Sequence, residues 1–284
     1  MPQFDPVAFK AGTHDQWNNV AEKWDAWGPL IETWLGPATE RMLDMAEIGE
    51  GARVLHVAGG SGHEAMHTAR RVGPSGYVLV TDFSERLIEL AEANIKAAGH
   101  ANIEARVMDG EDLHLPGESF DAVVSRVGLI FFPDQIGSVR QQIAATRHGG
   151  HVGAVVYATA EECRFFSDPV GIIRRHAELG PPLPGQPGPF SLGAPGKIEA
   201  LFEEAGLVDV KAEKIVSPLK MASAAECLRF EQESFGALHQ MLSKLDDAGK
   251  QAAWDEVAAA LRAFETADGF EGPCTMIAAI GRKP

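Results

Sequence analysis

The sequence of 284 residues has few cysteines, no long apolar run and no excess of basic side chains. Three cysteines, an odd number spread widely along the chain, predict reduced thiols and a cytoplasmic protein. No apolar run reaches the roughly 18 residues of a membrane span, and the first residues lack the pattern of a secretory signal. The net charge of −15 repels phosphate backbones and anionic lipids. We therefore expect neither nucleic acid nor a membrane as a partner.

The composition that is present is that of an enzyme-sized globular protein, with 45% hydrophobic and 23% charged residues. From residue 51 onward, short apolar segments alternate with helical patterns. Strands are expected at 53–57, 77–82, 103–107, 121–125 and 151–157, with helices at 63–71 and 85–98. Such alternation predicts an α/β fold, doubly wound, with a mostly parallel sheet covered on both faces.

The chain divides into four expected regions. Residues 1–50, rich in tryptophan, are expected to form an N-terminal helical cap, and 51–160 a Rossmann-like core. Residues 161–196, rich in proline and glycine toward their end, read as a loop on the substrate side. Residues 197–284 complete the core and include a helical insertion at 223–266, read as two helices. The apolar character of these helices favours a homodimer.

A glycine-rich turn, Ala58-Gly59-Gly60-Ser61-Gly62, joins the first strand to the first helix of the core. Glycine lets the backbone approach a ligand closely, and the helix that follows offers free N–H groups. Asp82 ends the second strand about 20 residues later, where a carboxylate accepts hydrogen bonds from a ribose. Asp109 and Gly110 follow the third strand, a position suited to an adenine edge. The alternative is that both carboxylates only cap turns.

On these residues the sequence resembles the class I S-adenosylmethionine-dependent methyltransferases, in the branch similar to ubiquinone/menaquinone-biosynthesis C-methyltransferases. The resemblance extends over residues 53–157, and more weakly over 197–215. It is carried by the segments VLHVAGGSG at 54–62, VTD at 80–82, MDGEDL at 108–113, SFDAVVSR at 119–126 and HGG at 148–150.

The resemblance implies a seven-stranded sheet whose last strand, 274–280, is antiparallel. It further implies S-adenosylmethionine as cofactor, with Gly60 and Gly62 beside the methionine part, Asp82 at the ribose, and Asp109 with Gly110 at the adenine. The implied reaction is methyl transfer to a small molecule, which we expect to be cyclic or aromatic.

The sequence departs from the family pattern at His56, where the family has a carboxylate. The segment 63–67 also satisfies H-E-x-x-H, which places His63 and His67 on one helix face. With His56 they offer three imidazoles for Zn²⁺ or Fe²⁺, and Glu64 as the group that activates water. This reading predicts a metal-dependent hydrolase or lyase that has lost the cofactor. The plain alternative is two solvated histidines on a helix surface.

Catalytic residues for methyl transfer are less clearly marked in the sequence. His14 and Tyr157 are candidate general bases. Arg126, Phe131, Phe132 and Tyr157 are candidates for the substrate pocket, although ordinary core packing is the favoured interpretation for the two phenylalanines. The tryptophans of the cap are expected to pack on the sheet, with one or two facing the substrate. Since no catalytic residue is secure, a non-catalytic binding module is a third reading.

Overall fold

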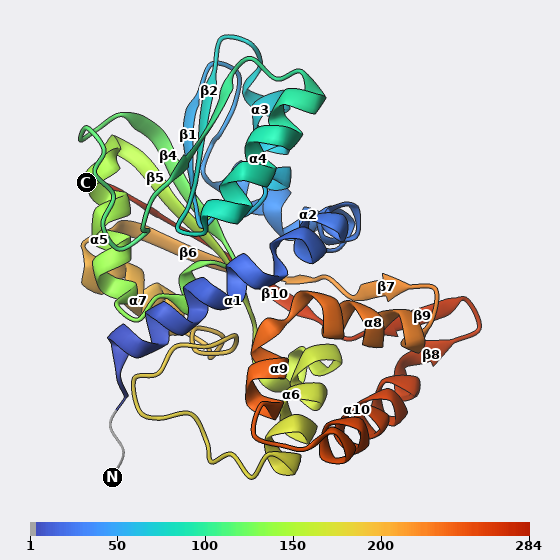
Figure 1. The fold of residues 1–284 in the computed structure, drawn as a ribbon. Helices are drawn as coiled ribbons and strands as arrows, with labels where there is room; N and C mark the ends of the chain where they lie inside the picture. Colours follow the sequence, from blue (N-terminus) through green and yellow to red (C-terminus); the bar gives the residue numbers. More distant parts are fainter. Residues whose placement is uncertain (1–3) are drawn as a thin grey trace.

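The computed structural model describes residues 4–284, which form a seven-stranded sheet in the order β3-β2-β1-β4-β5-β10-β6 (Figure 1). Strands β1 to β5 pair in parallel, and β10 runs antiparallel to both β5 and β6. The expected doubly wound fold with an antiparallel last strand is thus confirmed. The strands are β1 (Arg53–Val57), β2 (Tyr77–Asp82), β3 (Ile103–Val107), β4 (Phe120–Arg126), β5 (Thr146–Tyr157), β6 (Val208–Val216) and β10 (Thr275–Arg282).

Helices cover both faces of this sheet. One face carries α2 (Gly28–Met45), α3 (His63–Val72) and α4 (Glu85–Ala98), and the other carries α5 (Gln135–Ala145) and α7 (Lys197–Ala205) (Figure 1). Alternate residues of β1 therefore enter different layers. Val54 lies in the larger apolar core with α2 and α3, whereas Leu55 and Val57 lie in the smaller core on the opposite face.

A helical lobe lies beyond the end of the sheet, and α1 (Pro6–Ala26) crosses between the two (Figure 1). Helix α1 contacts α4 on the sheet side and α8 and α9 on the lobe side. The lobe contains α6 (Arg164–His176), α8 (Ala224–Ser234), α9 (Gly236–Leu242), α10 (Asp247–Leu261) and a small sheet of β7 (Leu219–Met221), β8 (Glu265–Thr266) and β9 (Gly269–Gly272).

Two expectations about the regions outside the core were wrong in part. The region 161–196, expected to be a loop, contains α6, whose buried residues follow the helical spacing Phe165, Phe166, Pro169, Ile172 and Ile173. The insertion 223–266 has three helices rather than two, because α8 and α9 are separate helices that meet at 235–236. The cap 1–50 contains two helices, α1 and α2, and α2 includes Pro37 near its centre.

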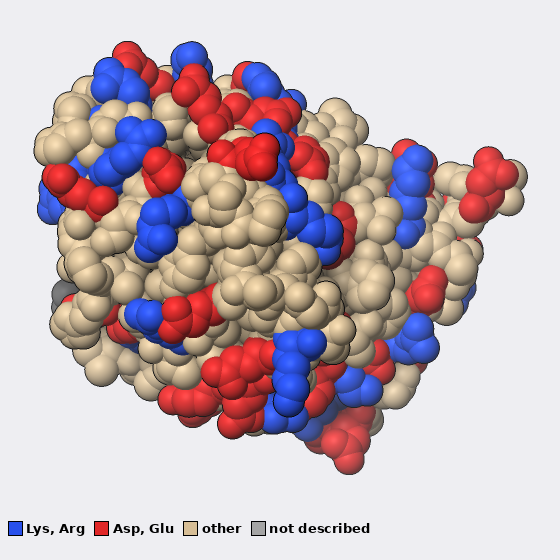
Figure 2. Space-filling view, turned by 90° about the horizontal axis from the view of Figure 1, so that it is seen from above, with Lys and Arg blue, Asp and Glu red and all other residues tan. Residues whose placement is uncertain are grey.

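The face of the molecule seen from above carries charged side chains of both signs (Figure 2). Figure 2 shows acidic and basic side chains interleaved over the face seen from above, with no continuous basic patch on that face. Within residues 4–284, no helix is both long enough and apolar enough to cross a membrane.

Candidate active site

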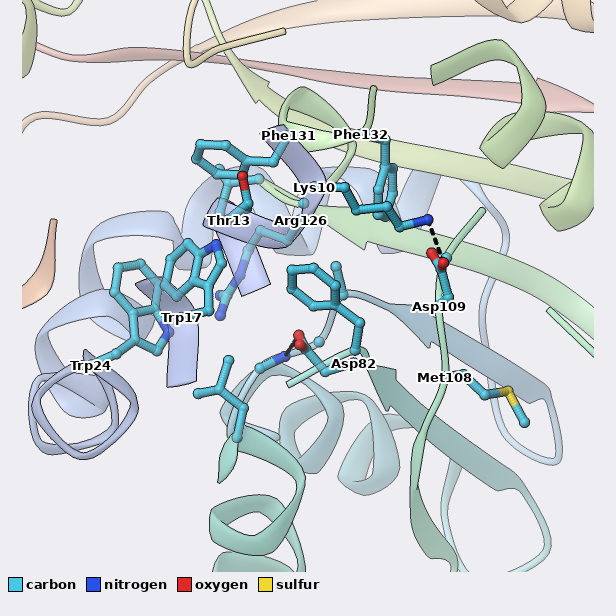
Figure 3. Close-up of a pocket in the computed structure, with 18 of the residues that line it drawn as sticks. Lys10, Thr13, Trp17, Trp24, Asp82, Met108, Asp109, Arg126, Phe131 and Phe132 are labelled. Carbon is cyan, nitrogen blue, oxygen red and sulfur yellow. Dashed lines mark hydrogen bonds and ion pairs between the residues drawn. The ribbon is translucent and has the colours of Figure 1, made fainter. Parts of the chain in front are cut away.

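A cleft of about 830 Å³, partly open to solvent, lies where β1, β2, β3 and β4 end. This is the edge at which open α/β sheets bind ligands. Helix α1 covers it, so side chains from the N-terminal helix face the loops of the core (Figure 3). The lining residues are Lys10, Thr13, Trp17, Trp24, Ala58, Gly59, Gly60, Glu64, Asp82, Phe83, Leu87, Met108, Asp109, Gly110, Arg126, Val127, Gly128, Phe131, Phe132 and Pro133.

The floor of the cleft is made of two tight turns that touch each other. Ala58, after β1, and Val127, after β4, both have left-handed backbones, with φ of 55° and 52°. Such conformations are costly for residues with a side chain, and especially for a β-branched valine. A Cβ on Gly128 would lie 2.5 Å from the Cβ of Ala58. The turns therefore come this close only because one of them has glycine at the contact.

Asp82 is buried at the end of β2 and holds the glycine-rich turn in place. Its carboxylate accepts hydrogen bonds of 3.0 Å from the backbone N–H of Gly60 and of Ser84 (Figure 3). Burial raises the pKa of Asp82 to about 6, and these backbone donors limit the rise by stabilising the charged form. The carboxylate lines the cleft, as the sequence predicted.

Asp109 lines the same cleft at the end of β3, where Lys10 of α1 reaches it (Figure 3). The Lys10 ammonium also lies 2.5 Å from Glu111. Burial lowers the pKa of Lys10, but the two carboxylates more than offset this and raise it overall. An ion pair thus links α1 to the third strand across the mouth of the cleft, a contact between distant segments that no local sequence pattern signals.

His56 faces α3, where it meets two residues of the H-E-x-x-H helix. Its Nε2 lies 3.0 Å from the Thr68 hydroxyl, and its Nδ1 lies 3.6 Å from Glu64. Glu64 in turn lies 3.3 Å from the Arg126 guanidinium, which also lies 2.5 Å from Glu32. Burial raises the pKa of Glu64, but the charges of Arg126 and His56 outweigh burial and lower it. Glu64 is therefore a buried, ionised carboxylate.

The three histidines predicted to bind a metal do not converge. Helical periodicity turns His63 and His67 away from the sheet, toward Asp25 and Glu40 of the N-terminal helices. His63 is also packed against Gly28, whose Cβ, if present, would lie 2.3 Å from its ring. Across residues 4–284, no group of three histidine, cysteine or acidic residues is arranged to hold a metal ion. The predicted zinc or iron site at His56, His63 and His67 is not supported.

The two candidate general bases lie outside the cleft. His14 of α1 is not among the lining residues: its Nε2 lies 2.9 Å from Glu85, and its ring packs on Phe83 at the border of the cleft, with centroids 5.3 Å apart. Tyr157 is buried in the aromatic packing of Trp34, Phe166 and Phe190. By contrast, the predicted pocket residues Arg126, Phe131 and Phe132 do line the cleft. Lys10 and Thr13 also line the cleft but were not predicted, because the sequence of a helix does not show which part of the fold the helix covers.

Comparison with known proteins agrees with this architecture. A family model described as a methyltransferase domain matches residues 54–150. Aklanonic acid methyltransferase of a Streptomyces species is 34% identical over 116 residues, covering 41% of this chain and 53% of that protein. Demethylmenaquinone methyltransferase of Lactococcus lactis is 30% identical over 142 residues, covering 48% and 54%. The chain therefore spans about half the length of these curated relatives.

Two solved structures share the fold over most of the chain. The YcgJ protein of a Bacillus has a TM-score of 0.58 at 18% identity, covering 87% of this chain and 98% of that one. The [4+2]-cyclase SpnF has a TM-score of 0.56 at 16% identity, covering 94% and 96%. The fold over most of the chain is therefore shared with these solved structures, and the matched residues 54–150 form the part of the sheet that borders the cleft.

Proposed function

We propose that the protein is an S-adenosylmethionine-dependent methyltransferase that acts on a small cyclic or aromatic molecule. The observation that carries the proposal is a single cleft lined by the glycine-rich turn, Asp82 and Asp109. In this arrangement the Asp82 carboxylate would accept hydrogen bonds from the ribose hydroxyls, and Asp109 with Gly110 would meet the adenine.

The methionine end of the cofactor would lie over Gly60, beside Glu64. Gly62, also predicted at this place, does not line the cleft, and a Cβ on it would lie 3.3 Å from the Cβ of Ala91 in α4. Glu64 lines the cleft, and its Oε1 is buried without a hydrogen-bond partner among the described residues. A buried carboxylate oxygen needs a donor, and the cofactor's ammonium group is one. We infer that Glu64 supplies the negative charge that the family has at the position of His56.

The acceptor would bind on the side of the cleft formed by Trp17, Trp24 and Phe131, whose rings meet at centroid distances of 5.2 and 5.9 Å. Flat aromatic walls suit a cyclic or aromatic molecule and exclude water. When bound, the cofactor supplies a methyl group on a sulfonium. An acceptor carbon, oxygen or nitrogen would form the new bond to this methyl group, the carbon–sulfur bonding pair would stay on sulfur, and the acceptor's proton would leave to solvent or a base.

The other readings of the sequence have less support. A metal-dependent hydrolase or lyase would need three imidazoles that converge on one metal ion. The imidazoles of His56, His63 and His67 instead face different neighbours. A binding module remains an outcome of the test below, because one fold can support unrelated activities. The cytoplasmic location, the homodimer and the exclusion of nucleic acid and membrane stay predictions.

The test is calorimetric titration of protein treated with a chelator. We expect one S-adenosylmethionine per chain, and at least tenfold weaker binding in Asp82→Ala, with exposed Asp112→Ala as the matched control. Binding must be followed by transfer of a radiolabelled methyl group to a panel of hydroxylated quinones and phenols. No binding by the chelated protein would overturn the proposal, and binding without transfer to any acceptor would favour the module.

A further inference from the structure

Arg126, at the end of β4, lines the cleft, and its positive charge is already matched by two carboxylates. Its side chain is only 8% exposed, and its Nη2 lies 2.5 Å from Glu32 of α2. Its Nε lies 3.3 Å from Glu64 of α3, and its Nη1 donates a hydrogen bond of 3.3 Å to the Thr39 hydroxyl. Every nitrogen of the guanidinium therefore has a partner within the protein, and its one charge faces two negative charges.

The other charges of the cleft do not restore a free positive group. Lys10, the second lysine or arginine in the lining, contacts both Asp109 and Glu111. Asp82 forms no ion pair within residues 4–284 and is held by backbone N–H groups. The lining thus has more carboxylates than cations, and each cation meets two carboxylates. Water screens these charges little in a partly closed cleft, so they repel an incoming anion.

Arg126 is the group that an anionic acceptor would need. A guanidinium binds a carboxylate through two parallel hydrogen bonds, and in the view of Figure 3 the Arg126 side chain extends into the cleft between Trp17 and Asp82. Trp17 belongs to the aromatic wall proposed for the acceptor. Glu32 is not among the lining residues, so it acts on the cleft through Arg126, as a positioning residue that occupies the guanidinium from α2.

We propose that Glu32 determines the acceptor specificity of the cleft. By matching the charge of Arg126 it leaves no cation for an acidic acceptor, so rings that carry a carboxylate or another anionic group are rejected. The acceptor class is then a ring system without an anionic group, such as a phenol. This inference rests on the proposed function, and it deepens it by naming the charge of the acceptor.

The test compares two probes that differ by one charged group, 2-naphthol and 6-hydroxy-2-naphthoate, by calorimetric titration in the presence of S-adenosylhomocysteine. Wild-type protein is expected to bind 2-naphthol about tenfold more tightly than the naphthoate, since like charges near one another weaken binding. Glu32→Gln is expected to tighten the naphthoate at least fivefold and to leave 2-naphthol within twofold. The matched control is Glu40→Gln, which removes the same charge from α2 but contacts His67 and Arg71 outside the cleft.

The comparison of the two probes on wild-type protein needs no variant, so it holds even if Glu32→Gln folds poorly. Naphthoate binding as tight as that of 2-naphthol, or binding of neither probe, would overturn the inference. So would an unchanged preference in a folded Glu32→Gln, or an equal change in Glu40→Gln, which would mean that only the overall charge matters. Methyl transfer to an anionic acceptor would also overturn it, but the proposed methyltransferase function would survive that result.

Discussion

The imidazole of His56 and the carboxylate of Glu64 lie 3.6 Å apart in the interior, where His56 is 1% and Glu64 3% exposed. His56, one residue before the end of β1, stands where the family resemblance implies a carboxylate, and Glu64, the second residue of α3, places a carboxylate beside it. The negative charge at this place therefore comes from the helix, and it borders the cleft.

Glu64→Gln should weaken S-adenosylmethionine binding at least tenfold while leaving 5′-methylthioadenosine binding within twofold. The second compound has the adenosine and sulfur but lacks the ammonium that Glu64 is proposed to meet. Calorimetric titration with both ligands measures the difference. Equal weakening of both ligands would mean that the substitution only distorts the cleft.

His56→Asp should lower the free energy of unfolding by about 3 kcal/mol, because it places a second carboxylate beside Glu64 and removes the imidazole that meets Thr68. Combining it with Glu64→Gln leaves one carboxylate again, so the double variant should lose less stability than the two single variants summed. It should also bind S-adenosylmethionine more tightly than Glu64→Gln alone. Urea unfolding and titration measure both quantities, and simple additivity would show that the two residues are not coupled.

The raised pKa of Asp82 predicts two opposite responses to acid. Between the ordinary value of 3.8 and about 6, the folded protein holds a proton that the unfolded chain does not. This group's contribution to stability is therefore greatest at low pH and is lost as pH rises through about 6. Cofactor affinity should instead fall as pH drops below 6, because the neutral carboxyl is a poorer acceptor for ribose. Titrations from pH 5 to 8 should show this fall in wild type and a flat, weak profile in Asp82→Asn.

Lys10→Met should increase the dissociation rate of S-adenosylmethionine severalfold, because it removes the ion pair that ties α1 to Asp109 and Glu111. Stopped-flow displacement measures this rate. Lys23→Met is the matched control on the same helix, since its exposed ammonium lies 3.3 Å from Glu233 in the helical lobe. An equal effect of both variants would point to general loosening of α1 instead.

The core was predictable because its signals are local. Strand periodicity, glycine turns and the carboxylates at strand ends lie within short segments, and they placed Gly60, Asp82 and Asp109 in one cleft. Helix α6 could also have been found, since its phenylalanines and isoleucines follow helical spacing. It was overlooked because the prolines that follow it suggested a longer loop.

The metal prediction failed for a geometric reason that the sequence already contained. Residues at i and i+4 share a helix face, so the pair Glu64 and Thr68 faces the sheet when the pair His63 and His67 faces α1 and α2. His56 meets the first pair because its strand lies under that face. What could not be read from the sequence is which face packs inward, because that depends on segments distant along the chain.

Helix α1 has a further consequence through its two neighbours. It touches the carboxylates at the proposed adenine end through Lys10, and through Trp17 and Trp24 it forms the wall of the cleft proposed for the acceptor. A ligand on either side orders the same helix, so the conformational entropy lost on binding the first is not lost again on binding the second. Thermodynamic linkage then makes the effect reciprocal. Bound S-adenosylhomocysteine increases the affinity for the acceptor by the same factor by which bound acceptor increases the affinity for S-adenosylhomocysteine.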